Sequence, residues 1–239
     1  MTIKGVELLI SMVSVLFTYF ICSSLIGYTR ALVAEKMGDN TPESFGFLTL
    51  NPFAHVSRIW IVLIVWLQVI HLYMPFGLGR YIPINPVVIQ GRYRGFKLAA
   101  VYFSDSFAAI IIAIIAFFGL IALHGAQALF LLNRAMTLHN VELVTPHIST
   151  LGMIATWFLM TFFLMATLMS AFGLIINCFH FMYFYFFENA LQDNEYADMI
   201  MLFGPLLLLY VLIYVVQDSI INFVTLIAYI LAYCIGIIG

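Results

Sequence analysis

Long apolar runs separated by short polar stretches are the main pattern of this 239-residue chain. A helix that crosses a bilayer needs about 20 mostly apolar residues, and six runs approach or exceed that length. The six runs cover residues 7–28, 59–76, 98–123, 150–178, 199–216 and 217–239. The second run is short, and only Gln217 and Asp218 separate the last two, so the pattern fits four to six spans and we expect six. It predicts an all-α polytopic membrane protein.

The polar stretches between the runs are short. The longest, about 30–58, is too small for a soluble domain, so we expect a single membrane-embedded domain over residues 1–239. The first run is too long for the apolar core of a signal peptide, and no small-residue cleavage site follows it. We therefore expect it to remain as a span.

Composition agrees with a membrane protein and excludes other classes. Hydrophobic residues make up 64% of the chain and charged residues 8%, with a mean hydropathy of +1.10, whereas soluble domains carry about 25% charged residues. Nine basic and eleven acidic residues give a net charge of -2, which excludes a basic nucleic-acid-binding protein. Three cysteines in apolar stretches, without metal-type spacing, predict reduced packing residues and not a disulfide scaffold. These are Cys22, Cys178 and Cys234.

The basic residues do not decide which way the chain crosses the membrane. If six spans alternate, five basic residues fall on one side and four on the other, a difference too small for the positive-inside rule. The five are Lys4, Arg80, Arg92, Arg94 and Lys97, and the four are Arg30, Lys36, Arg58 and Arg134.

Two stretches differ from ordinary loops. The first runs from Gly38 to His55, where glycine and proline predict turns and the alternation Leu48-Thr49-Leu50 predicts a short strand. The second covers 75–86, where two glycines and three prolines exclude a regular helix although its flanks are apolar. Non-helical backbone at membrane depth must be buried in protein or line a wet cavity. The second stretch is therefore either an interfacial connection or a re-entrant segment.

In this order and spacing, the two stretches resemble motifs of the site-2 protease family, the membrane-embedded zinc metalloproteases. The family's G-D-x-T turn, its L-T-L-N-P-x-x-H segment and its F-G…P-V-N-P run all have counterparts here. The resemblance covers about residues 26–98 and implies a site-2 protease-like helical bundle. The matching positions include Gly38, Asp39, Thr41, Gly46, Asn51, Pro52, His55, Phe76, Gly77, Pro83, Asn85 and Pro86.

At the positions that the resemblance assigns to the family's catalytic residues, this chain has neither metal ligands nor a general base. The HExxH motif, whose two histidines bind zinc and whose glutamate is the general base, falls on residues 26–30. Ile26 and Gly27 offer no ligand, and the guanidinium of Arg30 has no lone pair for a metal. The aspartate of the family's third element falls near Tyr185, in a run from Asn177 to Phe187 that predicts a continuous aromatic helix end. We therefore expect no catalytic residues, no metal and no cofactor.

Other polar residues leave several possibilities open. No two of the six histidines are three or four residues apart, so a relocated zinc site has no sequence support. Asp105 lies inside the third run, where a carboxylate is costly. It is either solvated near the interface or paired with Arg30, or less favourably with Lys97. Arg30 itself is either a buried structural cation or an interfacial residue that snorkels to the headgroups.

The resulting hypothesis is a non-proteolytic, site-2 protease-like membrane protein. It would bind the lipid bilayer and other transmembrane proteins as a helix-binding partner or assembly subunit, with the aromatic and methionine-rich surfaces either facing lipid or docking a partner. The alternatives are an active zinc metalloprotease with unconventional ligands and a small transporter or channel. The resemblance to bacterial members suggests the bacterial inner membrane as its location.

Overall fold

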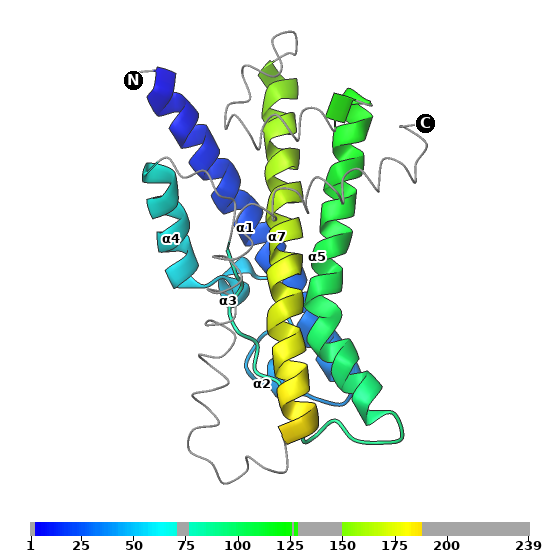
Figure 1. Ribbon diagram of the computed structural model, residues 1–239. Helices are drawn as coiled ribbons and strands as arrows, with labels where there is room; N and C mark the ends of the chain where they lie inside the picture. The colour runs from blue at the N-terminus through cyan, green and yellow to red at the C-terminus, as the bar shows by residue number, and fades with distance from the viewer. Residues whose placement is uncertain (1–2, 71–76, 126, 129–149, 188–239) are drawn as a thin grey trace.

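The computed structural model describes residues 3–70, 77–125, 127–128 and 150–187, and its regular elements are all helices. In Figure 1 the long helices lie side by side, with the shorter ones gathered beside the first of them. The elements are α1 (Ile3–Lys36), α2 (Thr41–Ser44), α3 (Pro52–His55), α4 (Arg58–Val69), α5 (Arg94–His124) and α7 (Thr150–Phe187). The prediction of an all-α membrane protein is confirmed.

Three of the predicted spans correspond to helices that are long and apolar enough to cross a membrane. They are Ser11–Lys36 within α1, Arg94–His124 as α5, and Ile154–Tyr185 within α7. The predicted spans at 199–216 and 217–239 lie outside the described residues, so the count of six stays a prediction.

The predicted span at 59–76 differs from the structure. Helix α4 has 12 residues and ends at Val69, which gives a length of about 18 Å against a hydrocarbon core of about 30 Å. It cannot cross the bilayer by itself. In Figure 1 it lies beside the N-terminal half of α1.

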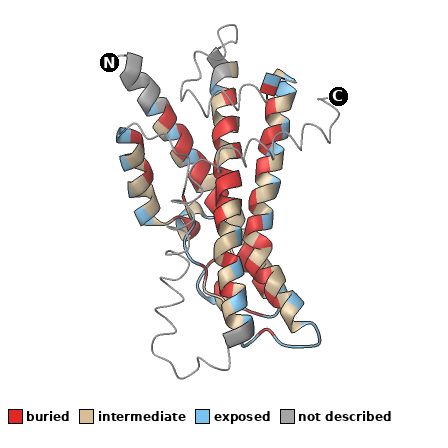
Figure 2. Cartoon of the chain, viewed as in Figure 1, coloured by how far each residue is buried: buried red, intermediate tan, exposed pale blue. Residues whose placement is uncertain are grey.

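Helices α1, α5 and α7 form the core of the bundle, and Figure 2 shows their buried residues turned toward one another. Ala109, Ala113 and Ala116 lie on one face of α5 and are all buried, and such small residues let membrane helices approach closely. Phe117 of α5 meets Phe163 of α7 with ring centroids 5.6 Å apart. The three described long helices therefore pack against one another.

The predicted strand at Leu48-Thr49-Leu50 is wrong, because Leu48 and Thr49 form a bend and Leu50 is in no regular element. Local bonds use the groups that a strand would need for pairing. The carbonyl oxygen of Thr49 lies 2.7 Å from His55 Nε2, and the Thr49 hydroxyl accepts a hydrogen bond from the Asn51 N–H at 3.2 Å.

The prediction of a non-helical, packed segment is confirmed for residues 77–86, while Phe76 lies outside the described residues. The hydroxyl of Tyr19 donates to the Leu78 carbonyl at 2.8 Å, and the Arg80 N–H donates to the His55 carbonyl at 2.6 Å. Gly77 is so close to α1 that an added Cβ atom would lie 2.9 Å from the Tyr19 ring. The segment is therefore packed against α1 and α3.

The predicted aromatic helix end is also confirmed, because α7 continues without a break through Tyr185 to Phe187. The rings of Phe181 and Tyr185 stack with centroids 5.6 Å apart. Of the cysteines, Cys22 is buried as expected for a packing residue, whereas Cys178 is exposed on α7, and both are free. Cys234 lies outside the described residues.

Candidate functional site

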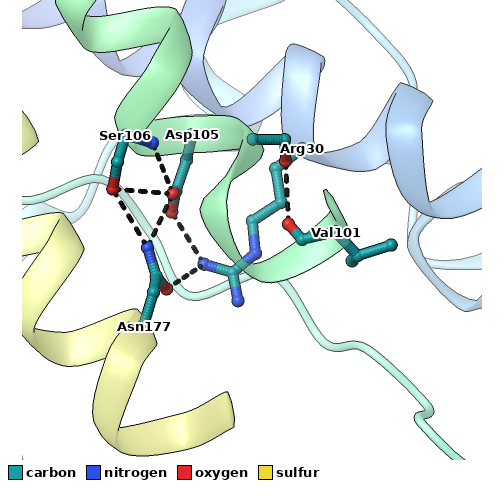
Figure 3. Close-up of polar contacts among 6 residues, drawn as sticks. Arg30, Val101, Asp105, Ser106 and Asn177 are labelled. Carbon is teal, nitrogen blue, oxygen red and sulfur yellow. Dashed lines mark hydrogen bonds and ion pairs between the residues drawn. The ribbon is translucent and has the colours of Figure 1, made fainter. Parts of the chain in front are cut away.

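An ion pair joins α1 to α5 in the interior of the bundle. Arg30 Nη1 lies 2.8 Å from Asp105 Oδ2, and the two side chains are only 9% and 16% exposed. Figure 3 shows the Arg30 guanidinium directed at the Asp105 carboxylate. Of the sequence alternatives, the structure brings Arg30 and Asp105 together, while Lys97 Nζ instead donates to the Gln90 carbonyl at 3.0 Å. Arg30 is not a snorkelling surface residue, because burial leaves it 8% exposed.

Helix α7 supplies the third member of this cluster, Asn177. Its Oδ1 accepts from Arg30 Nη1 at 3.2 Å, and its Nδ2 donates to Asp105 Oδ1 at 2.6 Å. The amide therefore bridges both charges, as Figure 3 shows. Ser106 completes the network, since its backbone N–H donates to Asp105 Oδ1 at 2.6 Å and its hydroxyl accepts from Asn177 Nδ2 at 3.3 Å. We call Arg30, Asp105, Ser106 and Asn177 the polar cluster.

From the sequence, Asn177 was only the start of the predicted aromatic helix end, and Ser106 had no predicted role. A signal existed in both cases, because a polar residue in a long apolar run needs a partner. Gly173 also contributes, one turn before Asn177: a Cβ atom there would lie 2.9 Å from the Ser106 hydroxyl. Glycine at this position lets α5 and α7 approach closely enough for the amide to reach the carboxylate.

The rest of the Arg30 guanidinium contacts an aromatic ring. Its Nε and Nη2 atoms are buried and have no hydrogen-bond partner among the described residues, while its Cζ atom lies 5.6 Å from the centroid of the Tyr102 ring. A cation over an aromatic face is worth about 2 kcal/mol when desolvated. The ring on α5 thus partly offsets the hydrogen bonds that Nε and Nη2 do not make.

The second position of the HExxH resemblance, Gly27, lies against His55. A Cβ atom added at Gly27 would collide with His55 Nδ1 and would lie 2.9 Å from its Cγ. The imidazole therefore fills the space that any side chain at position 27 would need. Ile26, at the first position, packs against the apolar core.

His55 is fixed by its own contacts. Because the Thr49 carbonyl accepts a hydrogen bond, Nε2 carries the ring proton and the buried Nδ1 has no hydrogen-bond partner among the described atoms. Burial lowers the pKa of His55 below its ordinary 6.5, and the bond to Thr49 offsets part of that shift. The residue is therefore a neutral packing group.

The retained motif residues hold one another in place. The buried carboxylate of Asp39 accepts the Thr41 N–H at 2.9 Å with one oxygen and the Asn85 N–H at 2.8 Å with the other. It thereby ties the first unusual stretch to the second. Asn51 Oδ1 accepts the Phe53 N–H at 3.1 Å and caps α3, with Pro52 at the first helical position. Gly38 and Gly46 adopt φ values of 101° and 76°, which other residues rarely adopt.

The remaining site residues are dispersed. Tyr185 is 57% exposed and lies beside Gly95, where an added Cβ atom would be 3.3 Å from its ring. It is eight residues beyond Asn177, or about 12 Å along α7. His124 bonds to the Thr156 hydroxyl at 2.7 Å. His180 packs among aromatic rings, and the other three histidines lie outside the described residues.

A zinc ion does not fit the residues at the positions that the resemblance assigns to the metal. Zinc needs three or four nitrogen, sulfur or oxygen lone pairs that converge, whereas positions 26, 27 and 30 offer an alkyl group, a hydrogen and a cation. In the described part of the chain, no group of three His, Cys, Asp or Glu side chains could hold a metal ion.

Comparison with known proteins gives one informative match. The chain is 32% identical over 117 residues to "Putative zinc metalloprotease YwhC" of Bacillus subtilis (strain 168), over 46% of this chain and 48% of that protein. The chain thus spans about half the length of the curated relative that it matches. No family model matches the chain, and no solved structure matches it.

Proposed function

We propose that this protein is a non-proteolytic relative of the site-2 proteases that binds transmembrane helices, as a partner or assembly subunit of a membrane complex. The observation that supports the proposal is the polar cluster, because it includes Arg30, at one of the positions that the resemblance assigns to a metal ligand. Arg30 brings a permanent positive charge to that place, and Asp105 and Asn177 hold it there. A cation held so close would repel Zn²⁺ instead of binding it.

The position of His55 is a second observation that supports the same proposal. A general-base glutamate at position 27 would need the space that the His55 ring occupies. Recovery of catalysis would therefore require the segment before α4 to move as well as two or more substitutions. The packing around Gly27 therefore suits glycine and leaves no space for a glutamate side chain.

Exposed apolar stripes on the helices offer surface for partners. On α5, Phe107, Ile111 and Ile115 follow one another at intervals of four residues and are 57–65% exposed, so they form one face of the helix. This face contacts either lipid or another transmembrane helix. We propose that part of it contacts a partner helix.

Site-specific photo-crosslinking in the native membrane tests this proposal. A crosslinkable amino acid at Ile111 is expected to yield a discrete adduct with another membrane protein, identified by mass spectrometry, and the same protein should co-purify in mild detergent. The matched control is Ala113, which faces the bundle interior and should give no such adduct. Crosslinks to lipid alone, together with purification of the chain free of partners, would contradict the proposal.

One alternative is supported by a specific observation. The relative's printed name describes it as a zinc metalloprotease, which keeps an active enzyme with unconventional ligands as the second candidate. One zinc per purified chain, lost together with cleavage of a test substrate, would favour it. A transporter has less support, because Asp105, a carboxylate well inside a span, is engaged by Arg30 and Asn177.

A further inference from the structure

Four basic residues gather at one end of the helix bundle, where α1 and α7 end and α5 begins, the lower end in Figure 1. They are Lys36, Arg92, Arg94 and Lys97. Packing fixes this arrangement, because Ala34 of α1 belongs to the same buried cluster as Ile89 and Leu98, and Met37, just after α1, packs against this cluster.

This arrangement differs from the alternation of six spans, which placed Lys36 opposite Arg92. Among the described residues between them no helix crosses the bilayer, because α4 starts beside the middle of α1, where the Ser57 N–H donates to the Tyr19 hydroxyl at 3.1 Å. Leu78 also bonds to Tyr19, and Ile89 packs against Ala34 near the end of α1. Lys4 lies in the first turn of α1, at the opposite end. Among the basic residues at the ends of the described spans, four therefore lie at this end of the bundle and one, Lys4, lies at the opposite end.

The four residues lie at the depth of lipid headgroups. Helix α5 has 31 residues, or about 46 Å, close to the full bilayer thickness of about 40–45 Å, so its first turn reaches the headgroup layer. Tyr93 and Phe96, beside the basic residues, are 64% and 74% exposed. Exposed aromatic rings next to lysine and arginine are typical of a membrane interface.

Two of the four cations bond to backbone carbonyls of the loop before α5, and the other two are exposed. Arg94 Nε donates to the Ile89 carbonyl at 3.1 Å, and Lys97 Nζ donates to the Gln90 carbonyl at 3.0 Å, which folds the loop before α5. Lys36 and Arg92 are exposed on the same end. Lipid phosphates at this depth are negatively charged, so the exposed cations Lys36 and Arg92 are complementary to anionic headgroups.

We propose that this end faces the cytoplasm and binds the phosphate groups of anionic phospholipids in the cytoplasmic leaflet. Basic residues next to a span favour that side, and each contributes to attraction by an anionic surface. Neither the proposed orientation nor the proposed lipid binding depends on whether the protein has protease activity or a protein partner.

Native mass spectrometry of the purified full chain tests the lipid binding, with phosphatidylglycerol and phosphatidylcholine as probes. Wild type should retain phosphatidylglycerol preferentially, and Lys36→Gln and Arg92→Gln should each reduce that preference about fivefold, or about 25-fold together. Arg58→Gln is the matched control, since Arg58 is exposed at the start of α4, away from this end, and should leave the preference unchanged. Equal retention of both lipids by wild type, or an equal loss in the control, would overturn the proposal.

Chemical labelling tests the orientation. In a background with Cys22, Cys178 and Cys234 replaced by serine, Gln90→Cys should react with a membrane-impermeant maleimide in inside-out vesicles and not in intact cells. Gln90 is exposed beside Arg92. Reaction in intact cells would place this end outside and overturn the assignment.

Discussion

Arg30 is held by contacts from two neighbouring helices at once: a carboxylate and a ring from α5, and an amide from α7. A buried charge is tolerated only when such partners surround it. Arg30 is therefore expected to tolerate little change.

Breaking the ion pair from either side should be costly. Arg30→Met and Asp105→Leu are each expected to lower the free energy of unfolding in detergent by about 3–5 kcal/mol, because each leaves an uncompensated buried charge. The double variant should recover much of this loss. Arg58→Met, at an exposed position, is the control and should change stability by about 0.5 kcal/mol or less. Additive effects in the double-mutant cycle would show that the pair does not act as a unit.

The close approach of Gly27 to His55 should be visible in a second cycle. Gly27→Ala is expected to destabilise the protein by about 1–3 kcal/mol, because the new methyl group overlaps the imidazole. In a His55→Ala background the same change should become neutral or stabilising by up to about 1 kcal/mol, as usual for alanine in a helix. Thermal unfolding of the four proteins measures this, and a loss of equal size in both backgrounds would rule out the overlap.

His55 should also make stability depend on pH. Its folded-state pKa is lowered below 6.5, so the unfolded chain binds the proton more readily, and stability is lost as pH falls below about 6.5. The contribution is fully present above that pH. Melting curves between pH 8 and pH 5 should fall more steeply for wild type than for His55→Gln, which cannot titrate. Parallel curves would mean that His55 is not buried in its neutral form.

At the scale of the elements, the two unusual stretches form one connected structure on the side of α1. Asp39 bonds both stretches, Arg80 bonds the carbonyl of His55, and Tyr19 bonds Leu78. Motifs that are separate in sequence therefore support each other in space. This explains why non-helical backbone can persist beside membrane-spanning helices.

Asp39→Asn tests this connection. The amide nitrogen would face a backbone N–H that the carboxylate now accepts, so one charge-assisted hydrogen bond is lost, at a cost of about 1.5–3 kcal/mol. Hydrogen exchange in residues 77–86 should become faster, while exchange in α5 should be unchanged. Glu43→Gln, at an exposed position on α2, is the control. Unchanged protection of 77–86 in the Asp39 variant would contradict the role of the carboxylate.

At the scale of the whole molecule, the three long helices are held together by an apolar core and by the polar cluster that crosses all three. Among the described residues, neither contains three His, Cys, Asp or Glu side chains that could hold a metal ion. We expect that chelators leave the melting temperature unchanged and that purified protein contains far less than one zinc per chain. A fall in melting temperature on chelation, reversed by added zinc, is the result that would refute this expectation.

The sequence by itself determined the helical class, the three described spans and the pairing of Arg30 with Asp105 as one of its options. Apolar length and the cost of a buried charge are local properties, which the order of residues already contains. The sequence also predicted that residues 77–86 are not helical, since glycine and proline exclude a helix wherever they lie.

Only the tertiary structure decided which partners meet. Asn177 reaches Asp105 because Gly173 lets α7 approach α5, and His55 fills the space beside Gly27 because a bend, not a strand, precedes α3. It also decided that α4 is too short to span, which brings Lys36 and Arg92 to one end of the bundle. These outcomes depend on contacts between residues up to 147 positions apart in the sequence. Local hydrophobic and polar patterns do not show which of such distant residues come into contact.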